Sequence, residues 1–162
     1  MVTRRTVLKA GLGGAALLAL GSTAALLIGR DPVRDREQVL RAVIPAVLDG
    51  ALPLEEPQRA AAISAALNDT LVALAGLAPE TQRQLAQLFA LLAIAPLRRV
   101  LAGVPVNWSS ASVAEVSAFL RSWRTHRLGL LQGAYHGLHE LVIGPWYAQP
   151  AHWGAIGYPG PP

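Results

Sequence analysis

Two histidines near the C-terminal end of the chain have the spacing of metal ligands. His136 and His139 lie three positions apart with Glu140 beside the second, so on a helix the two imidazoles share one face. A third ligand would have to come from His126 or His152. The same pair also suits the polar side of an amphipathic helix, and no H-E-x-x-H order is present. A metal site is therefore one alternative, and a polar helix face is the ordinary interpretation.

Other kinds of active-site chemistry have little support in the sequence. The serines between positions 109 and 122 lie in a predicted loop, at a cap or on a helix, and none has the strand-turn-helix G-x-S-x-G setting of a nucleophile. No glycine loop of the phosphate-binding kind is present. The chain has no cysteine, which excludes disulfides, thiolate metal sites, covalent haem and iron–sulfur clusters. We expect no catalytic residue, metal or cofactor in this chain.

The charge balance argues against nucleic-acid binding. Three of the 14 basic residues lie before residue 30, so 11 basic side chains face 10 acidic ones in the rest of the chain. That part is therefore close to neutral and lacks a basic footprint. The densest basic cluster suits either a solvated helix face or a contact with an anionic partner or lipid phosphates, and it consists of Arg121, Arg124, His126 and Arg127.

Helical periodicity dominates residues 30–149. Expected helices start at Asp31-Pro32, at Pro57, at Pro79 and at the Ser112-Val113-Ala114-Glu115 capping box, and the last apolar pattern runs to about Tyr147. The second helix should close at Gly76, and a break is expected between residues 127 and 133. No alternating strand pattern occurs. The sequence predicts an all-α bundle of four to five helices.

Residues 85–97 are apolar almost all round the helix, with Gln87 the only polar side chain. The sequence therefore predicts that this segment is the buried central helix of the bundle, kinked by Pro96. Arg98 and Arg99 are expected at its solvent end. Trp123 is expected in the core, whereas Trp108, in a loop, fits either the core or the surface.

The last residues have an unusual composition. Residues 144–162 hold five prolines, two tryptophans and two tyrosines and contain no charged side chain. We therefore expect residues 150–162 to form an extended tail that needs a surface to lie on. Large aromatic side chains dominate protein-binding sites, which makes a partner protein the expected surface. The alternative is that the tail folds back on its own bundle. The candidate partner-binding residues are Trp146, Tyr147, Trp153 and Tyr158.

The N-terminus has the pattern of a twin-arginine export signal. Arg4 and Arg5 follow Thr3 and precede Leu8 and Lys9, and a modestly apolar, glycine-containing stretch follows at residues 10–28. We assign residues 1–29 to this signal, residues 30–149 to the bundle and residues 150–162 to the tail. The expected partner of the signal is the twin-arginine translocase, which carries folded proteins.

The apolar part of the leader leaves its processing open. Cleavage near Ser22-Thr23-Ala24 and retention as an uncleaved anchor in the inner membrane both fit a 19-residue apolar stretch. Either outcome places the body on the periplasmic side, at or near the inner membrane.

Taken together, these features resemble one family. The twin-arginine leader, the cysteine-free helical body with Ile44-Pro45 in its first helix, and the terminal W-Y-x-x-P-x-x-W-x-x-x-G-Y-P-G-P-P are similar to gluconate 2-dehydrogenase subunit 3, the small or gamma subunit of membrane-associated flavin-dependent dehydrogenases. The resemblance implies a non-catalytic subunit without a cofactor. It would escort a leaderless large subunit, a glucose-methanol-choline type flavoprotein with bound FAD, through the twin-arginine pathway. Electrons would then pass to a cytochrome or quinone partner.

Two other classes of function stay open beside this resemblance. One is a free-standing periplasmic metal-binding protein or small enzyme that uses His136, His139 and Glu140. The other is a membrane-anchored structural module without a redox partner.

Overall fold

The first helix begins where the sequence predicts it. In the computed structural model, which describes residues 29–156, α3 (Pro32–Val47) starts after Asp31. The Asp31 carboxylate accepts hydrogen bonds from the backbone N–H groups of Val33, at 2.9 Å, and Arg34, at 3.3 Å. Pro32 occupies the first turn, where a missing N–H costs nothing. The Asp31 cap and Pro32 together determine the residue at which α3 begins, and so the point at which the chain enters the bundle.

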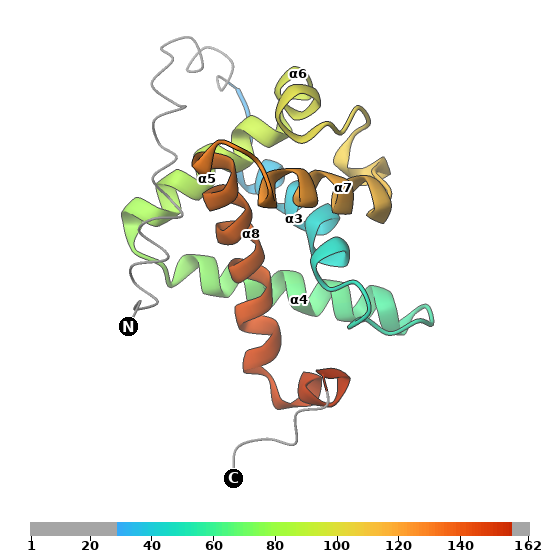
Figure 1. Cartoon of the computed structure of the whole chain (residues 1–162). Coiled ribbons are helices and arrows are strands. Elements are labelled where there is room, and N and C mark those ends of the chain that lie inside the picture. Colours follow the sequence, from blue (N-terminus) through green and yellow to red (C-terminus); the bar gives the residue numbers. More distant parts are fainter. Residues whose placement is uncertain (1–28, 157–162) are drawn as a thin grey trace.

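Helix α3 is the centre of the bundle. It packs against α4 (Gln58–Ala75), α5 (Pro79–Ala93), α7 (Val113–Arg124) and α8 (Gly129–Ala148), which surround it in Figure 1. Four of its apolar side chains are wholly inaccessible to solvent: Val39, Leu40, Val43 and Ile44. The all-α bundle is therefore confirmed for residues 29–156, which contain no strand. The expectation that residues 85–97 form the central helix is wrong, because only one side of α5 is buried.

The third predicted helix is in fact broken into two. Helix α5 ends at Ala93, Ile94 adopts an extended conformation, and α6 (Ala95–Leu97) with the π-helix η2 (Arg98–Ala102) continues at 88° to it. Pro96 explains the break, since it has no N–H to donate to the Leu92 carbonyl in a continued helix. The indole N–H of Trp108 donates to that carbonyl instead, at 2.8 Å. Trp108, whose location the sequence left open, is thus a core residue.

Arg98 corrects a second expectation. Its side chain is 4% exposed rather than at a solvent end. The guanidinium donates to the Val104 carbonyl at 3.3 Å and to the Asn107 side-chain oxygen at 3.2 Å. Burial lowers the pKa of Arg98, with a smaller contribution from the neighbouring Arg99. Arg98 therefore fastens the loop that leads to the short helix η3 (Trp108–Ser110), whereas Arg99 is exposed as predicted.

The capping box at the start of α7 is confirmed. Glu115 N–H donates to Ser112 Oγ at 3.2 Å, and the Ser112 backbone N–H donates to the Glu115 carboxylate at 2.8 Å. This start directs Phe119 and Trp123 inward, where their rings meet edge to face with centroids 4.7 Å apart. The Trp123 indole donates to the Leu101 carbonyl at 2.7 Å. Helix α7 is thereby attached to η2.

The C-terminal part of α8 and the N-terminal part of α4 project from the rest of the bundle where the two helices cross (Figure 1). Beyond α8 the chain was expected to be extended. Instead, Pro150–Ile156 forms a 3₁₀-helix, η4, that packs on the end of α8. This finding favours the folded-back alternative for that part of the tail, and residues 157–162 lie outside the described residues, as do residues 1–28.

We compared the helices in residues 29–156 with the length and hydropathy that a membrane-spanning helix needs. No individual helix there is long and apolar enough to cross a membrane. Helix α5 and the segment from Ala95 to Ala102 satisfy the criterion only as a pair, bent by 88°.

The buried position of Leu92 predicts the effect of removing its side chain. Leu92 is 0% exposed, so Leu92→Ala should lower the free energy of unfolding by about 2–5 kcal/mol, through lost apolar transfer and a residual cavity. Denaturant unfolding of the full chain measures this change. Leu54→Ala is the matched control, because Leu54 is 94% exposed and should change the stability by less than about 0.5 kcal/mol. Equal effects of the two substitutions would contradict the placement of the core.

Candidate functional site

Helix α8 places both candidate metal-binding histidines close to the ring of Tyr135. The ring centroids of His136 and His139 lie 5.2 Å and 5.5 Å from that of Tyr135. His136 is exposed and His139 is half-buried. His139 Nδ1 lies 3.9 Å from a Glu140 carboxylate oxygen, a distance that allows weak attraction rather than a good hydrogen bond. The two histidines are thus three positions apart on one helix, as predicted, and both contact the same tyrosine ring.

The third ligand that a metal site would need is not near this pair. His126 uses Nδ1 to accept the Leu128 backbone N–H at 3.1 Å. His152 stacks flat on Trp146 near the end of α8, with ring centroids 3.6 Å apart. Within residues 29–156, no three histidine, cysteine or acidic side chains gather closely enough to hold a metal ion. The described part of the chain therefore gives the metal-binding alternative no support.

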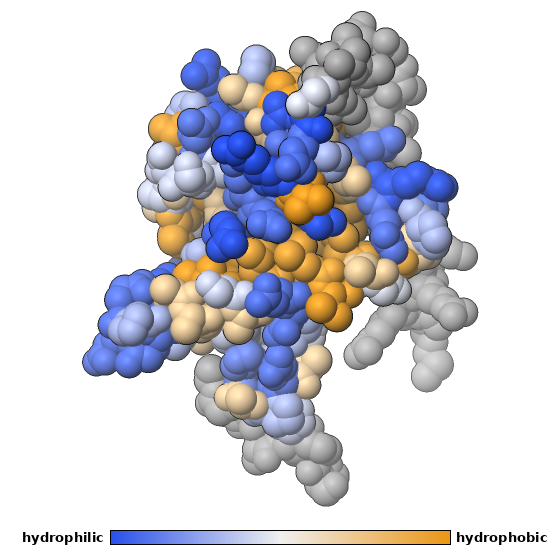
Figure 2. Space-filling view, turned by 180° about the vertical axis from the view of Figure 1, so that it is seen from behind, coloured by the Kyte–Doolittle hydropathy of each residue, from blue (hydrophilic) through white to orange (hydrophobic). Residues whose placement is uncertain are grey.

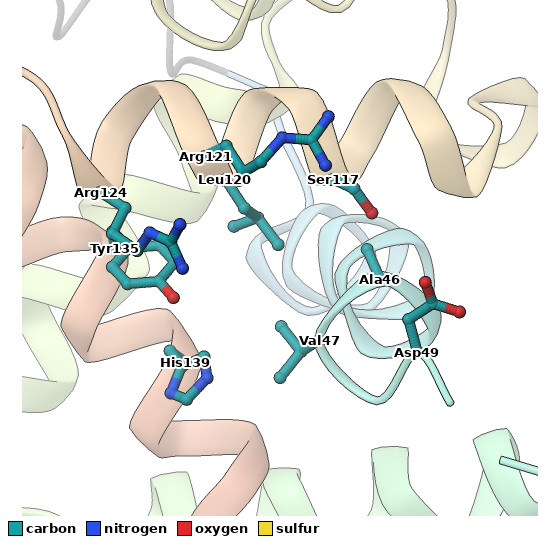
Figure 3. Close-up of a pocket in the computed structure, with 9 residues that line it drawn as sticks. All are labelled: Ala46, Val47, Asp49, Ser117, Leu120, Arg121, Arg124, Tyr135 and His139. Atoms are coloured by element: carbon teal, nitrogen blue, oxygen red, sulfur yellow. The ribbon is translucent and has the colours of Figure 1, made fainter. Parts of the chain in front are cut away.

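His139 borders a pocket of about 220 Å³ between the end of α3 and helices α7 and α8. Figure 3 shows Val47 and Leu120 pointing toward its centre, with Arg124, Tyr135 and His139 along one side. The polar lining is mixed in charge, since Asp49 lies on the side opposite Arg124. The complete lining is Ala46, Val47, Asp49, Ser117, Leu120, Arg121, Arg124, Tyr135 and His139.

Helix position and burial explain the two arginines of this pocket and the lowered pKa of His139. Arg121 and Arg124 stand in the last turn of α7, where cations offset the partial negative charge of the helix end. Burial lowers the pKa of His139, Arg124 and His136 lower it further, and Glu140 opposes them. The lowered pKa of His139 favours the neutral imidazole. In the described structure no hydrogen bond joins His139 to Ser117.

The aromatic residues proposed to bind a partner have different positions. Trp146, one of the predicted partner-binding residues, is 3% exposed and packs in the core, so little of its ring is available at the surface of this chain. Tyr147 and Trp153 are half-buried at the same end of the molecule, and the Trp153 indole donates to the Tyr147 carbonyl at 2.8 Å. Tyr158 lies outside the described residues, as do the export-signal residues Thr3, Arg4, Arg5, Leu8 and Lys9.

The structure also shows a role for His152 that sequence reasoning missed. His152 Nδ1 lies 2.7 Å from the Trp146 carbonyl oxygen, and its ring covers the Trp146 indole. Gln149 reaches across to Asp69 of α4, with 2.5 Å between amide and carboxylate. The His152 contacts hold η4 against α8, and the Gln149–Asp69 bond joins the end of α8 to α4. The available signal was Pro150 directly after Gln149, which stops the helix and lets the chain turn back.

The depressed pKa of His139 predicts a pH effect on stability. Folding favours the neutral imidazole, so this contribution is present above the ordinary pKa of 6.5 and is lost as the pH falls through the lower folded value. An NMR titration of the folded chain should give His139 a midpoint below 6.5, and His139→Gln should remove the corresponding loss of stability at acid pH. The urea-unfolded chain is the control, with a midpoint near 6.5. A folded midpoint at or above 6.5 would contradict this environment.

Comparisons with known proteins return no relative. No protein-family model matches the chain, and no curated protein or solved structure is similar enough to count as a match. The resemblance noted from the leader and the tail therefore stays a prediction.

Proposed function

We propose that this chain is the non-catalytic small subunit of a flavin-dependent dehydrogenase. It escorts a leaderless glucose-methanol-choline type large subunit, which holds FAD, through the twin-arginine pathway and stabilises it in the periplasm at or near the inner membrane. A cytochrome subunit is a further expected partner. The observation that carries the proposal is the paired Arg4 and Arg5, with Leu8 and Lys9 after them and the modestly apolar residues 10–28 behind.

The junction between leader and body supports this proposal. Arg30 donates to both carboxylate oxygens of Asp35, from Nε and Nη2, at 2.7 Å each. Asp35 is 6% exposed, and this hydrogen bonding raises the pKa of Arg30. A bidentate pair at a buried carboxylate is a well-defined anchor. The helical body therefore begins immediately after the leader, as suits cargo that the translocase takes in a folded state.

The surface of the body also suits a binding partner. Apolar residues gather across the middle of the face shown in Figure 2, above the projecting ends of α4 and α8. A contiguous exposed apolar area on a small domain is typical of protein interaction sites. Such a surface favours an accessory subunit over a free-standing enzyme.

The export hypothesis predicts that lysine cannot replace the arginine pair without loss of export. Changing Arg4 and Arg5 to lysine keeps the charge but removes the guanidinium groups, so this chain and its flavoprotein should both stay in the cytoplasm. Fractionation of the native host, with immunoblotting and periplasmic dehydrogenase activity, measures the effect. The matched control changes Arg34 and Arg41 to lysine, two exposed positions of α3, and should be exported normally. Normal export of the leader double variant would refute the proposal.

A shorter tail tests the docking part of the proposal separately. Ending the chain after Ile156 keeps the contacts of η4 with α8 and removes Tyr158 together with the other residues beyond position 156. If Tyr158 is a binding hot spot of at least about 2 kcal/mol, the flavoprotein should bind roughly 30-fold more weakly. Affinity measured with the purified large subunit gives the answer, with circular dichroism as the check on folding. Unchanged affinity would show that the last residues are not the interface.

A further inference from the structure

A groove lies beside the point where the leader joins the body. It has a volume of about 380 Å³ and is formed by the first turn of α3, the end of α4 and the exposed edge of α5. Its walls are largely apolar, with Val33, Leu74, Ala86 and Phe89 among them. Val33 is 52% exposed. Side chains of this kind gain free energy when an apolar occupant displaces water from them.

One of the residues that line the groove carries an unsatisfied hydrogen-bond donor. Arg36 lines it, and Arg36 Nε is buried without a hydrogen-bond partner in the described structure. Arg83, the other arginine of the groove, pairs with Glu80. A buried donor without a partner is costly. The best occupant therefore brings apolar side chains together with a hydrogen-bond acceptor, which a segment of polypeptide supplies through its own carbonyl groups.

The junction of leader and body adjoins the groove, because Pro32 and Val33 line its wall. The Arg30–Asp35 pair holds the chain against the first turns of α3. Gly29, directly before it, has φ +77, a left-handed conformation in which the chain changes direction. Residues 24–28 read Ala-Ala-Leu-Leu-Ile, and at about 3.3 Å per residue they reach about 17 Å from Gly29. Val33, on the groove wall, is only five positions after Ile28.

We propose that residues 24–28 of this chain occupy the groove, with a backbone carbonyl of that segment accepting the hydrogen bond of Arg36 Nε. The contact covers the apolar wall and satisfies the orphaned donor at once. Its existence does not depend on the proposed function. Combined with the export role, which does rest on that proposal, the contact keeps the apolar end of the leader out of water in the folded precursor while the arginine pair stays available to the translocase.

The absence of native cysteine allows a direct test by disulfide trapping in the full chain. Ala86 lines the groove and is exposed, so it is replaced by cysteine and combined, one at a time, with cysteine at Ala25, Leu26 or Leu27. Disulfides need Cα atoms within about 7 Å. At least one pair should oxidise at least about tenfold faster than its control, in which Ala61 carries the second cysteine. Ala61 is an exposed position of α4, about 20 Å along the helix from Leu74.

Disulfide formation requires the two cysteine side chains to face each other, and a second measurement does not have this requirement. Single-cysteine chains at positions 25, 26 and 27 are labelled with a maleimide, and the groove should slow labelling at one or more positions by at least about tenfold. Ala86→Trp fills the groove and should restore fast labelling, whereas Ala61→Trp should not. Failure of all three positions in both measurements would overturn the proposal. Protection that appears only with phosphatidylethanolamine–phosphatidylglycerol vesicles would place the segment in a bilayer and overturn it as well. Neither result bears on the Arg4 and Arg5 test, so the two proposals fail independently.

Discussion

The burial of α3 sets the position of the other long helices in residues 29–156. Val39, Leu40, Val43 and Ile44 are wholly inaccessible to solvent, and α4, α5, α7 and α8 each contact this helix. Interiors pack at crystal-like density, so a helix covered on several sides leaves its neighbours little freedom of placement. The groove at its start and the pocket at its end both have walls whose positions depend on this packing. Its entry is fixed in turn by the Asp31 cap and the Arg30–Asp35 pair.

Two tryptophan indoles supply hydrogen bonds to backbone carbonyls where the helix in the middle of the chain is interrupted. Pro96 breaks the helix that residues 79–102 would otherwise form and leaves the Leu92 carbonyl without its helical partner. Trp108 donates to that carbonyl, and Trp123 donates to the carbonyl of Leu101 at the end of η2. Each tryptophan thus combines a large apolar surface with one hydrogen bond to irregular backbone. The sharp turn after α5 is therefore a packed part of the core.

The functional proposal concerns the junction with the leader and the aromatic C-terminal region, and these two regions belong to opposite ends of the body. The chain enters α3 at one end, and the aromatic end of α8 with η4 lies at the other (Figure 1). Trp146, His152 and Trp153 are engaged with α8 itself, so any docking by the tail depends on what remains exposed beside them. An escort has to bind a translocase through its leader and a partner through its body. Separation of the two ends is compatible with both contacts at the same time.

The sequence alone determined the features that depend on local chemistry. Asp31-Pro32, Gly76 and the Ser112–Glu115 box predicted helix boundaries correctly, because caps and prolines act within one turn. Helical periodicity likewise predicted the all-α class. Tertiary structure alone decided which helix is central, since apolar residues all round a segment indicate burial without naming the neighbour that provides it. It also decided that Arg98 is buried, that His126 and His152 lie away from the His136–His139 pair, and that Pro150–Ile156 folds against α8. Each of these outcomes depends on contacts between residues far apart in the sequence, whose free energy no local pattern encodes.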